Sequence, residues 1–141
     1  MQAANLSLSV AATFEGARDA AHSVRGFLDA LSVLPREAAL LELAVAESLN
    51  NIIEHASCDP RSSVDLHVDA QGDRLRMVVV DEGLRNDPDG LNNFMSRPDA
   101  AHDGSSGLGI ALIRRIMDLV YYARQQHRNV LTMVARVNGQ R

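Results

Sequence analysis

The chain has 141 residues, of which 46% are hydrophobic and 23% charged, and these values predict one globular domain over residues 1–141. A formal net charge of −4 without a long basic run excludes broad binding to nucleic acid, because such binding depends on clustered Lys and Arg. The single cysteine excludes an internal disulfide, and no apolar stretch is long enough to cross a bilayer, so we expect a cytoplasmic protein that binds no membrane.

The first elements along the chain are a short strand and two helices. Apolar residues alternate with polar ones over 6–10, which predicts a strand, and helical spacing follows over 19–31. Pro35 opens the next element, since proline is well tolerated at the start of a helix. Residues 36–56 contain no further helix breaker and are predicted to form one long helix.

A β-hairpin and a long loop are predicted in the middle of the chain. Apolar and polar residues alternate over 64–68 and again over 75–80, with a turn at 71–73, which predicts two antiparallel strands. The second strand ends in the polar residues 81–83, so we expect these at an edge of the sheet. Residues 86–106 are rich in Asp, Asn, Gly, Pro and Ser, a composition typical of a long loop that serves as a lid.

The last elements are a helix and a second hairpin. Apolar residues at helical spacing over 110–120 predict a helix, and strands follow over about 120–124 and 130–137 with a turn at 127–129. The strands are mostly hairpin-connected and the helices are grouped, which indicates an α+β two-layer sandwich. We expect a mixed, mainly antiparallel sheet with the helices on one face.

Glu47 and Asn51 are the most informative pair in the long helix. Each residue advances the helix by about 100°, so the two lie one turn apart on the same side, away from the apolar residues. A carboxylate and an amide at this spacing can share one ligand, although a solvated helix face is the more common reason for such a stripe. Asn is a poor helix former, however, and Asn50 next to Asn51 in a strong helix is a local cost without a structural motive, which favours a function.

Two further segments carry candidate chemistry. Asp81 at a strand end can accept a hydrogen bond from an exocyclic amine and Gly83 leaves room for a flat ring, although a plain polar turn explains the same residues. A glycine cluster before a helix can direct backbone N–H groups at an anion, or it can form a flexible loop. Neither a P-loop nor a Rossmann fingerprint fits, because Ile110 and Leu112 occupy positions that those motifs require to be Lys and Gly. The cluster comprises Gly104, Ser105, Ser106, Gly107, Leu108 and Gly109.

The three segments, in this order and at these separations, resemble the motifs of the GHKL ATPases, a superfamily that includes DNA gyrase B, MutL and the histidine kinases. The resemblance covers the chain from about residue 6 to the C-terminus. Residues 42–51 and 107–118 are also similar to the small bacterial anti-sigma-factor serine kinases of partner-switching systems. The segments that resemble the N, G1 and G2 boxes are, respectively, Glu47-x-x-x-Asn51, Asp81-x-Gly83 and Gly107-x-Gly109.

The resemblance implies a Bergerat fold with a site for ATP and Mg²⁺ between the helices and the sheet. In such a site Asn51 would coordinate Mg²⁺, with Asn50 as a weaker neighbour. Asp81 would accept a hydrogen bond from the adenine amino group, beside Gly83. Glu47 would be the general base of the reaction. The residues that would contact the phosphates are Ser105, Ser106, Gly107, Leu108 and Gly109.

The implied activity is that of a protein-serine/threonine kinase that sequesters a sigma factor and phosphorylates a serine on a small anti-sigma-factor antagonist protein. A histidine kinase would need a dimerisation segment with its own phosphoacceptor histidine, for which the residues before Leu6 leave no room. Two alternatives remain open: a catalytically weak binding module that captures regulatory proteins, and an ATPase without a protein acceptor. Relatives are commonly dimers, which leaves a homodimer open as well.

Two positions depart from the family pattern. Leu84-Arg85-Asn86 stand where many relatives have a second glycine, and Asn129-Val130 stand where many relatives have Gly-Thr before the final strand. Glu47 and Asn51 are both present, so we expect an active kinase.

Overall fold

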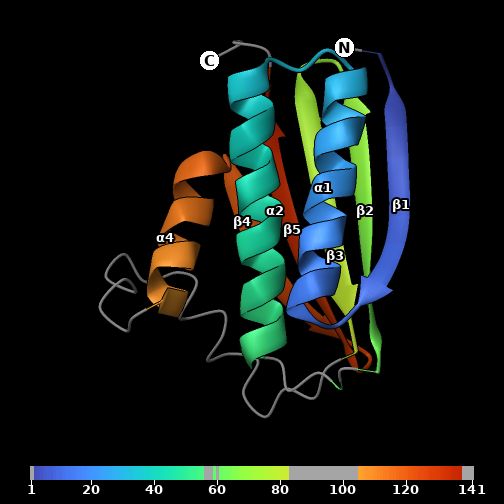
Figure 1. The fold of residues 1–141 in the computed structure, drawn as a ribbon, viewed down its shortest axis with the longest axis vertical. Coiled ribbons are helices and arrows are strands. Elements are labelled where there is room, and N and C mark those ends of the chain that lie inside the picture. The colour runs from blue at the N-terminus through green and yellow to red at the C-terminus, as the bar shows by residue number, and fades with distance from the viewer. Residues whose placement is uncertain (1, 56–58, 60, 83–104, 138–141) are drawn as a thin grey trace.

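The fold comes from a computed structural model, which describes residues 2–55, 59, 61–82 and 105–137 (Figure 1). None of the helices in these ranges is long and apolar enough to cross a membrane. The helices and strands, in chain order, are β1 Ala4–Ala11, α1 Phe14–Ala30, α2 Pro35–His55, β2 Ser63–Gln71, β3 Arg74–Asp81, α4 Ser105–Ile116, β4 Leu119–Gln125 and β5 Arg128–Arg136.

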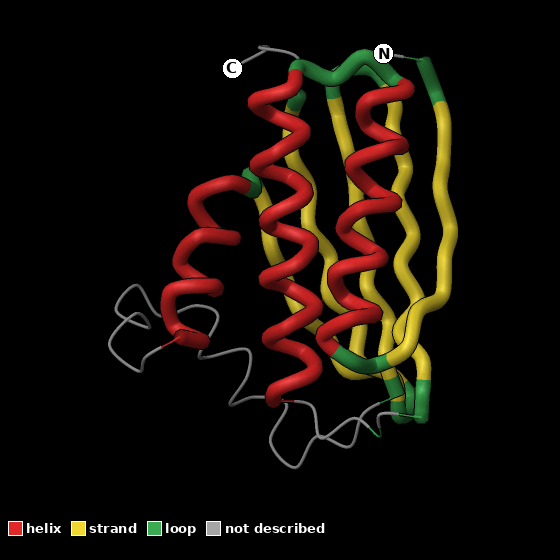
Figure 2. Tube along the Cα trace, viewed as in Figure 1, coloured by secondary structure: helices red, strands yellow, loops and turns green. Residues whose placement is uncertain are grey.

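The strands form one sheet in the order β1-β2-β3-β5-β4. All of its pairings are antiparallel, so the sheet is simpler than the mixed sheet that we expected. The helices lie together on one face of this sheet, with α2 beside α1 and α4 on the other side of α2 (Figures 1 and 2). The predicted α+β two-layer sandwich is confirmed.

The apolar side chains of both layers meet between the helices and the sheet. On β2 the buried residues Val64, Leu66 and Val68 alternate with exposed ones, because successive strand residues point to opposite faces. On α2, Val45 and Leu49 are fully buried one turn apart. Burying one such aliphatic side chain contributes about 1.5–3 kcal/mol, so this layer determines which side of α2 faces solvent.

Thr13 determines where α1 begins. Its Oγ1 accepts a hydrogen bond from the backbone N–H of Gly16 at 3.0 Å, the usual N-cap arrangement. A Cβ on Gly16 would lie 2.0 Å from the carbonyl oxygen of Ala11, so only glycine allows α1 to pack this closely on the end of β1. The helix therefore starts at Phe14, earlier than the apolar spacing over 19–31 predicts.

The boundaries of α4 differ from the prediction at both ends. The helix begins at Ser105, so the glycines at 107 and 109 lie inside it and not before it. It ends at Ile116, and shortly afterwards the backbone N–H of Asp118 donates to the carbonyl oxygen of Val134 at 2.9 Å. That bond begins the pairing of β4 with β5 and prevents the helix from continuing to residue 120.

The hairpin between β4 and β5 turns one residue earlier than predicted. Gln126 and His127 form the turn with φ values of 48° and 70°, the left-handed conformation that a two-residue hairpin requires. Asn129 is consequently part of β5 and does not belong to the turn. The predicted loop over 86–106 lies, up to residue 104, outside the described residues.

Candidate functional site

The predicted site residues gather at one end of the molecule. The C-terminal end of α2, the end of β3 and the N-terminal end of α4 all lie there, together with the hairpin between β4 and β5 (Figure 1). Asn51 comes from α2, Asp81 is the last residue of β3, and residues 105–109 begin α4. Gly83 lies outside the described residues.

Asn51 is buried, whereas Glu47 one turn before it is half-exposed. Only 7% of Asn51 is accessible, so a solvated helix face does not explain this residue. Its Nδ2 is buried and has no hydrogen-bond partner among the described residues. A buried amide donor without a partner costs about 1–3 kcal/mol, which makes Asn51 a candidate for a ligand contact. Glu47 has no ion pair or hydrogen bond with the described part of the chain.

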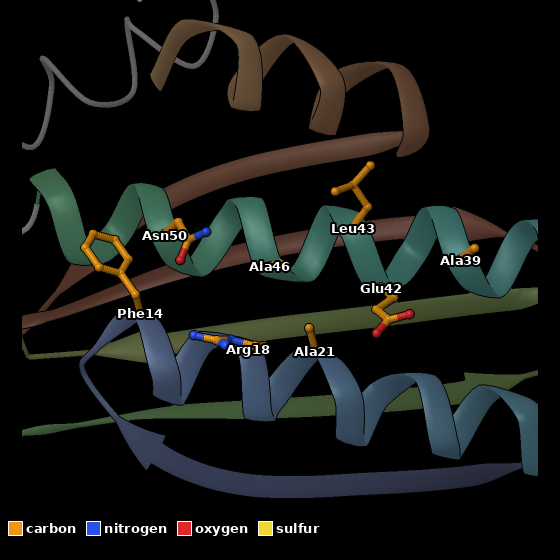
Figure 3. A pocket seen from close by; sticks show the side chains of 8 residues that line it. All are labelled: Phe14, Arg18, Ala21, Ala39, Glu42, Leu43, Ala46 and Asn50. Atoms are coloured by element: carbon orange, nitrogen blue, oxygen red, sulfur yellow. The ribbon is translucent and has the colours of Figure 1, made fainter. Parts of the chain in front are cut away.

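Asn50 faces a different part of the molecule. It lines a groove of about 460 Å³ between α1 and α2, where Phe14 and Arg18 face it from α1 (Figure 3). Asn50 and Asn51 leave the helix about 100° apart, so the structure does not direct both amides to one ligand. Asn50 Oδ1 is buried and without a partner among the described residues, and this groove is where a donor could reach it.

Asp81 belongs to a network of short hydrogen bonds. It is 2% exposed, and its Oδ1 accepts a hydrogen bond of 2.7 Å from Asn129 Nδ2. Asn129 Oδ1 in turn accepts from Tyr122 Oη and from Arg124 Nη1, each at 2.7 Å. Asn129 is 1% exposed, so this network holds the Asp81 carboxylate inside the protein. A plain polar turn at the end of β3 does not account for such an arrangement.

Three residues of the candidate site were not predicted from the sequence: Asn129, Tyr122 and Arg124. Asn129 is paired with Asp81 in the register of β3 and β5, so both side chains point to the helix-covered face of the sheet. The prediction placed Asn129 in a turn and compared Val130 with the threonine of relatives. The available signal was strand alternation: Leu131 and Met133 are buried on the same face, and counting back by two leads to Asn129.

The N-terminal end of α4 supplies backbone groups. The first turn of any helix leaves N–H groups without partners inside the helix, and the helix dipole makes this end favourable for an anion. The first turn of α4, residues 105–107, therefore places N–H groups that the helix does not use at the end of the molecule that also holds Asn51 and Asp81. This is consistent with phosphate binding, which for these residues stays a prediction.

The donor set fits a nucleotide with its metal better than a metal alone. Among the described residues there is no group of three or more His, Cys, Asp or Glu side chains that could hold a metal ion. Mg²⁺ commonly binds through one or two protein ligands together with substrate phosphates and water. Asn51 can supply one oxygen ligand, and its unpartnered Nδ2 can donate to a phosphate oxygen.

A helix-covered antiparallel sheet, with a carboxylate and a buried amide on the long helix and a buried Asp at a strand end, defines a two-layer α+β sandwich domain with polar residues at one end. The chain belongs to the family of the histidine kinase-like ATPase domain, whose model matches residues 10–135. This membership confirms the resemblance to the GHKL superfamily, and it implies ATP as the ligand of the site.

Curated relatives are similar over part of their length. The serine-protein kinase RsbW of Bacillus cereus (strain AH187) is 26% identical over 95 residues, which cover 64% of this chain and 59% of the relative. The serine-protein kinase RsbW of Halalkalibacterium halodurans is 30% identical over 84 residues, which cover 57% of this chain and 51% of the relative. The chain thus spans between 51% and 59% of the length of these relatives.

Solved structures share the fold. The RsbU and RsbW domains of a Mycobacterium tuberculosis protein align with a TM-score of 0.70 and 18% identity, covering 95% of this chain and 32% of theirs. A chain of the SiaB-SiaC complex from Pseudomonas aeruginosa aligns with a TM-score of 0.68 and 16% identity, covering 94% of this chain and 88% of that one.

Proposed function

We propose that the chain is a serine-protein kinase of a partner-switching system: it binds Mg-ATP, sequesters a sigma factor and phosphorylates a serine on a small antagonist protein. The observation that carries this proposal is the buried Asn51, one turn from Glu47, whose amide donor has no partner in the described part of this histidine kinase-like ATPase chain. The name serine-protein kinase RsbW of the curated relatives supports the choice of serine as the acceptor.

Each end of the nucleotide has candidate residues. Asp81 would accept a hydrogen bond from the amino group of adenine, and Gly83 would leave room beside the ring. Asn51 would hold Mg²⁺, which when bound neutralises the charge that develops on the phosphates. The backbone N–H of Gly107, in the first turn of α4, would contact the phosphates, with Gly109 beside it.

Glu47 would act as the general base. Its carboxylate is half-exposed and has no ion pair or hydrogen bond with the described residues, so it can accept the proton of an incoming hydroxyl. As that proton moves to Glu47, the serine oxygen forms a bond to the γ-phosphorus and the bond between this phosphorus and the β,γ-bridging oxygen breaks, leaving ADP. Asn51, one turn further along α2, would hold the phosphates and the acceptor close together.

The substitution Glu47→Gln tests this assignment. It keeps the shape of the side chain and removes the base, so we expect ATP affinity within about threefold of the wild type and a loss of transfer of about 10²–10⁴-fold. The assay mixes the chain with radiolabelled ATP and with small candidate antagonist proteins from neighbouring genes. The control is Glu54→Gln, which changes an exposed carboxylate on the same helix.

Three results would contradict the proposal or part of it. Equal loss of ATP binding and of transfer in Glu47→Gln would show that Glu47 is not the base. ATP binding without transfer to any protein would favour the binding module, and ATP hydrolysis without a protein acceptor would favour the ATPase.

A further inference from the structure

We propose that Asn129 is a positioning residue that orients Asp81 for recognition of the nucleobase. This inference rests on the proposed ATP site and adds to it a residue that acts through Asp81 and does not touch the nucleotide. Its basis is the chain of short hydrogen bonds, buried except for the partly buried one from Arg124, that runs from β4 through β5 to the end of β3.

The hydrogen bonds determine which way the Asn129 amide points. Its Oδ1 accepts from Tyr122 Oη and from Arg124 Nη1, and the Arg124 guanidinium can act there only as a donor. A flipped amide would place its NH₂ group against the Arg124 donor and its oxygen against the Asp81 carboxylate. Arg124 therefore keeps the Nδ2 of Asn129 directed at Asp81, where it donates at 2.7 Å.

This donated bond also determines how Asp81 can act. An Asp carboxylate rotates readily about χ2, and a buried donor on Oδ1 restricts that rotation. The carboxylate then offers its acceptor positions in one fixed direction. The exocyclic amine of adenine donates to such an acceptor, whereas inosine carries a carbonyl oxygen at the same ring position, so the two bases report directly on the orientation of Asp81.

The substitution Asn129→Asp replaces the amide donor by a carboxylate, which places a second negative charge beside Asp81. The new side chain has nearly the same shape and still presents an oxygen to Tyr122 and Arg124. We expect the affinity for Mg-ATP to fall by about tenfold or more, since a hydrogen bond to a charged group is lost, while the affinity for Mg-ITP changes by less than about threefold. The added negative charge acts equally on both triphosphates, so the ratio of the two dissociation constants isolates the contact with the base.

An exchanged double variant, Asp81→Asn with Asn129→Asp, covers the case in which the single variant folds poorly. The amide on β3 then donates to the carboxylate on β5 and keeps its own oxygen as an acceptor for adenine. We expect it to recover at least part of the ATP preference lost in Asn129→Asp. The control is Thr132→Val, which alters a buried polar residue of β5 on the opposite face of the sheet and should leave the ATP to ITP ratio unchanged.

The measurement is calorimetric titration of the full chain with Mg-ATP and Mg-ITP, with a thermal melt of each variant without nucleotide. Equal losses for both nucleotides in Asn129→Asp would overturn the proposal, because a purely structural role predicts that pattern. An exchanged variant that restores no preference would overturn it too. A wild-type chain that binds neither nucleotide contradicts the proposed function itself, so the two failures are distinguishable.

Discussion

Asn51 and Asp81 are both buried polar residues at the same end of the molecule, yet they differ in what surrounds them. Asp81 accepts a short hydrogen bond from Asn129, and that residue is held by Tyr122 and Arg124. Asn51 has a buried Nδ2 without a partner among the described residues. Protein groups therefore satisfy the part of the site assigned to the nucleobase. The part assigned to the metal and the phosphates has a buried donor without a partner among the described residues.

Because of this difference, Asn51 and Asp81 should respond differently to substitution. Removing a side chain from a satisfied buried network leaves other groups unpaired and lowers stability. Removing a buried donor that has no partner breaks no hydrogen bond, and it eliminates the desolvation cost of that donor. Both substitutions should weaken nucleotide binding, but only one should weaken the fold.

Asn51→Ala should have the largest effect on binding. We expect the affinity for Mg-ATP to fall by at least about 100-fold, because the change removes the proposed metal ligand and a donor to the phosphates. The melting temperature without nucleotide should not fall by more than about 3 °C, since the lost Nδ2 was unpaired. Calorimetry with and without EDTA, together with a thermal melt, measures both quantities.

Asn50→Ala is the matched control for this prediction. It removes an identical side chain from the neighbouring position, which lines the groove between α1 and α2 (Figure 3). We expect ATP affinity within about threefold of the wild type. Equal losses of affinity in the two variants would show that the different directions of the two amides do not separate their roles.

Asp81→Ala should affect both binding and stability. The change leaves the Nδ2 of Asn129 buried without its carboxylate partner, which costs about 1–3 kcal/mol of unfolding free energy. ATP affinity should fall by about 10-fold to 100-fold, because the acceptor for the adenine amine is lost. Urea unfolding and calorimetry measure the two effects, and Asp65→Ala, an exposed carboxylate on β2, should change neither. An unchanged stability would contradict the network seen here.

Helices and strands were predicted correctly where the pattern of apolar and polar residues is regular. The alternation over 64–68 predicted β2 because every second residue is buried against the helices. Pro35 predicted the start of α2 correctly. The start of α4 was missed because glycine disfavours helices, and here the packing of α4 on α2 outweighs that local preference, with Ile113 buried in the core.

The site was predictable where one helix or one strand end carries it, and not where two strands must be aligned. Glu47 and Asn51 follow from helical spacing, and Asp81 follows from its place at the end of a strand. The contact of Asn129 with Asp81 joins residues 48 apart and depends on the register of β5 against β3. A strand register shifted by one residue moves every side chain to the opposite face of the sheet. Because the turn was placed at 127–129, the contact of Asn129 with Asp81 was not predicted.

Tyr122→Phe should have the smallest effect and tests how much support the network needs. The change removes one of the two donors to Asn129 Oδ1, and Arg124 still donates at 2.7 Å. Arg124 and the Asp81 carboxylate still direct the amide, so we expect ATP affinity to fall by about threefold or less and the unfolding free energy by about 1 kcal/mol. Calorimetry and urea unfolding measure both. Losses of ATP affinity and unfolding free energy as large as those of Asp81→Ala would mean that Tyr122 holds the end of β3 by more than this hydrogen bond. The remaining contacts of Asn129 would then be too weak to keep the nucleobase end of the site rigid.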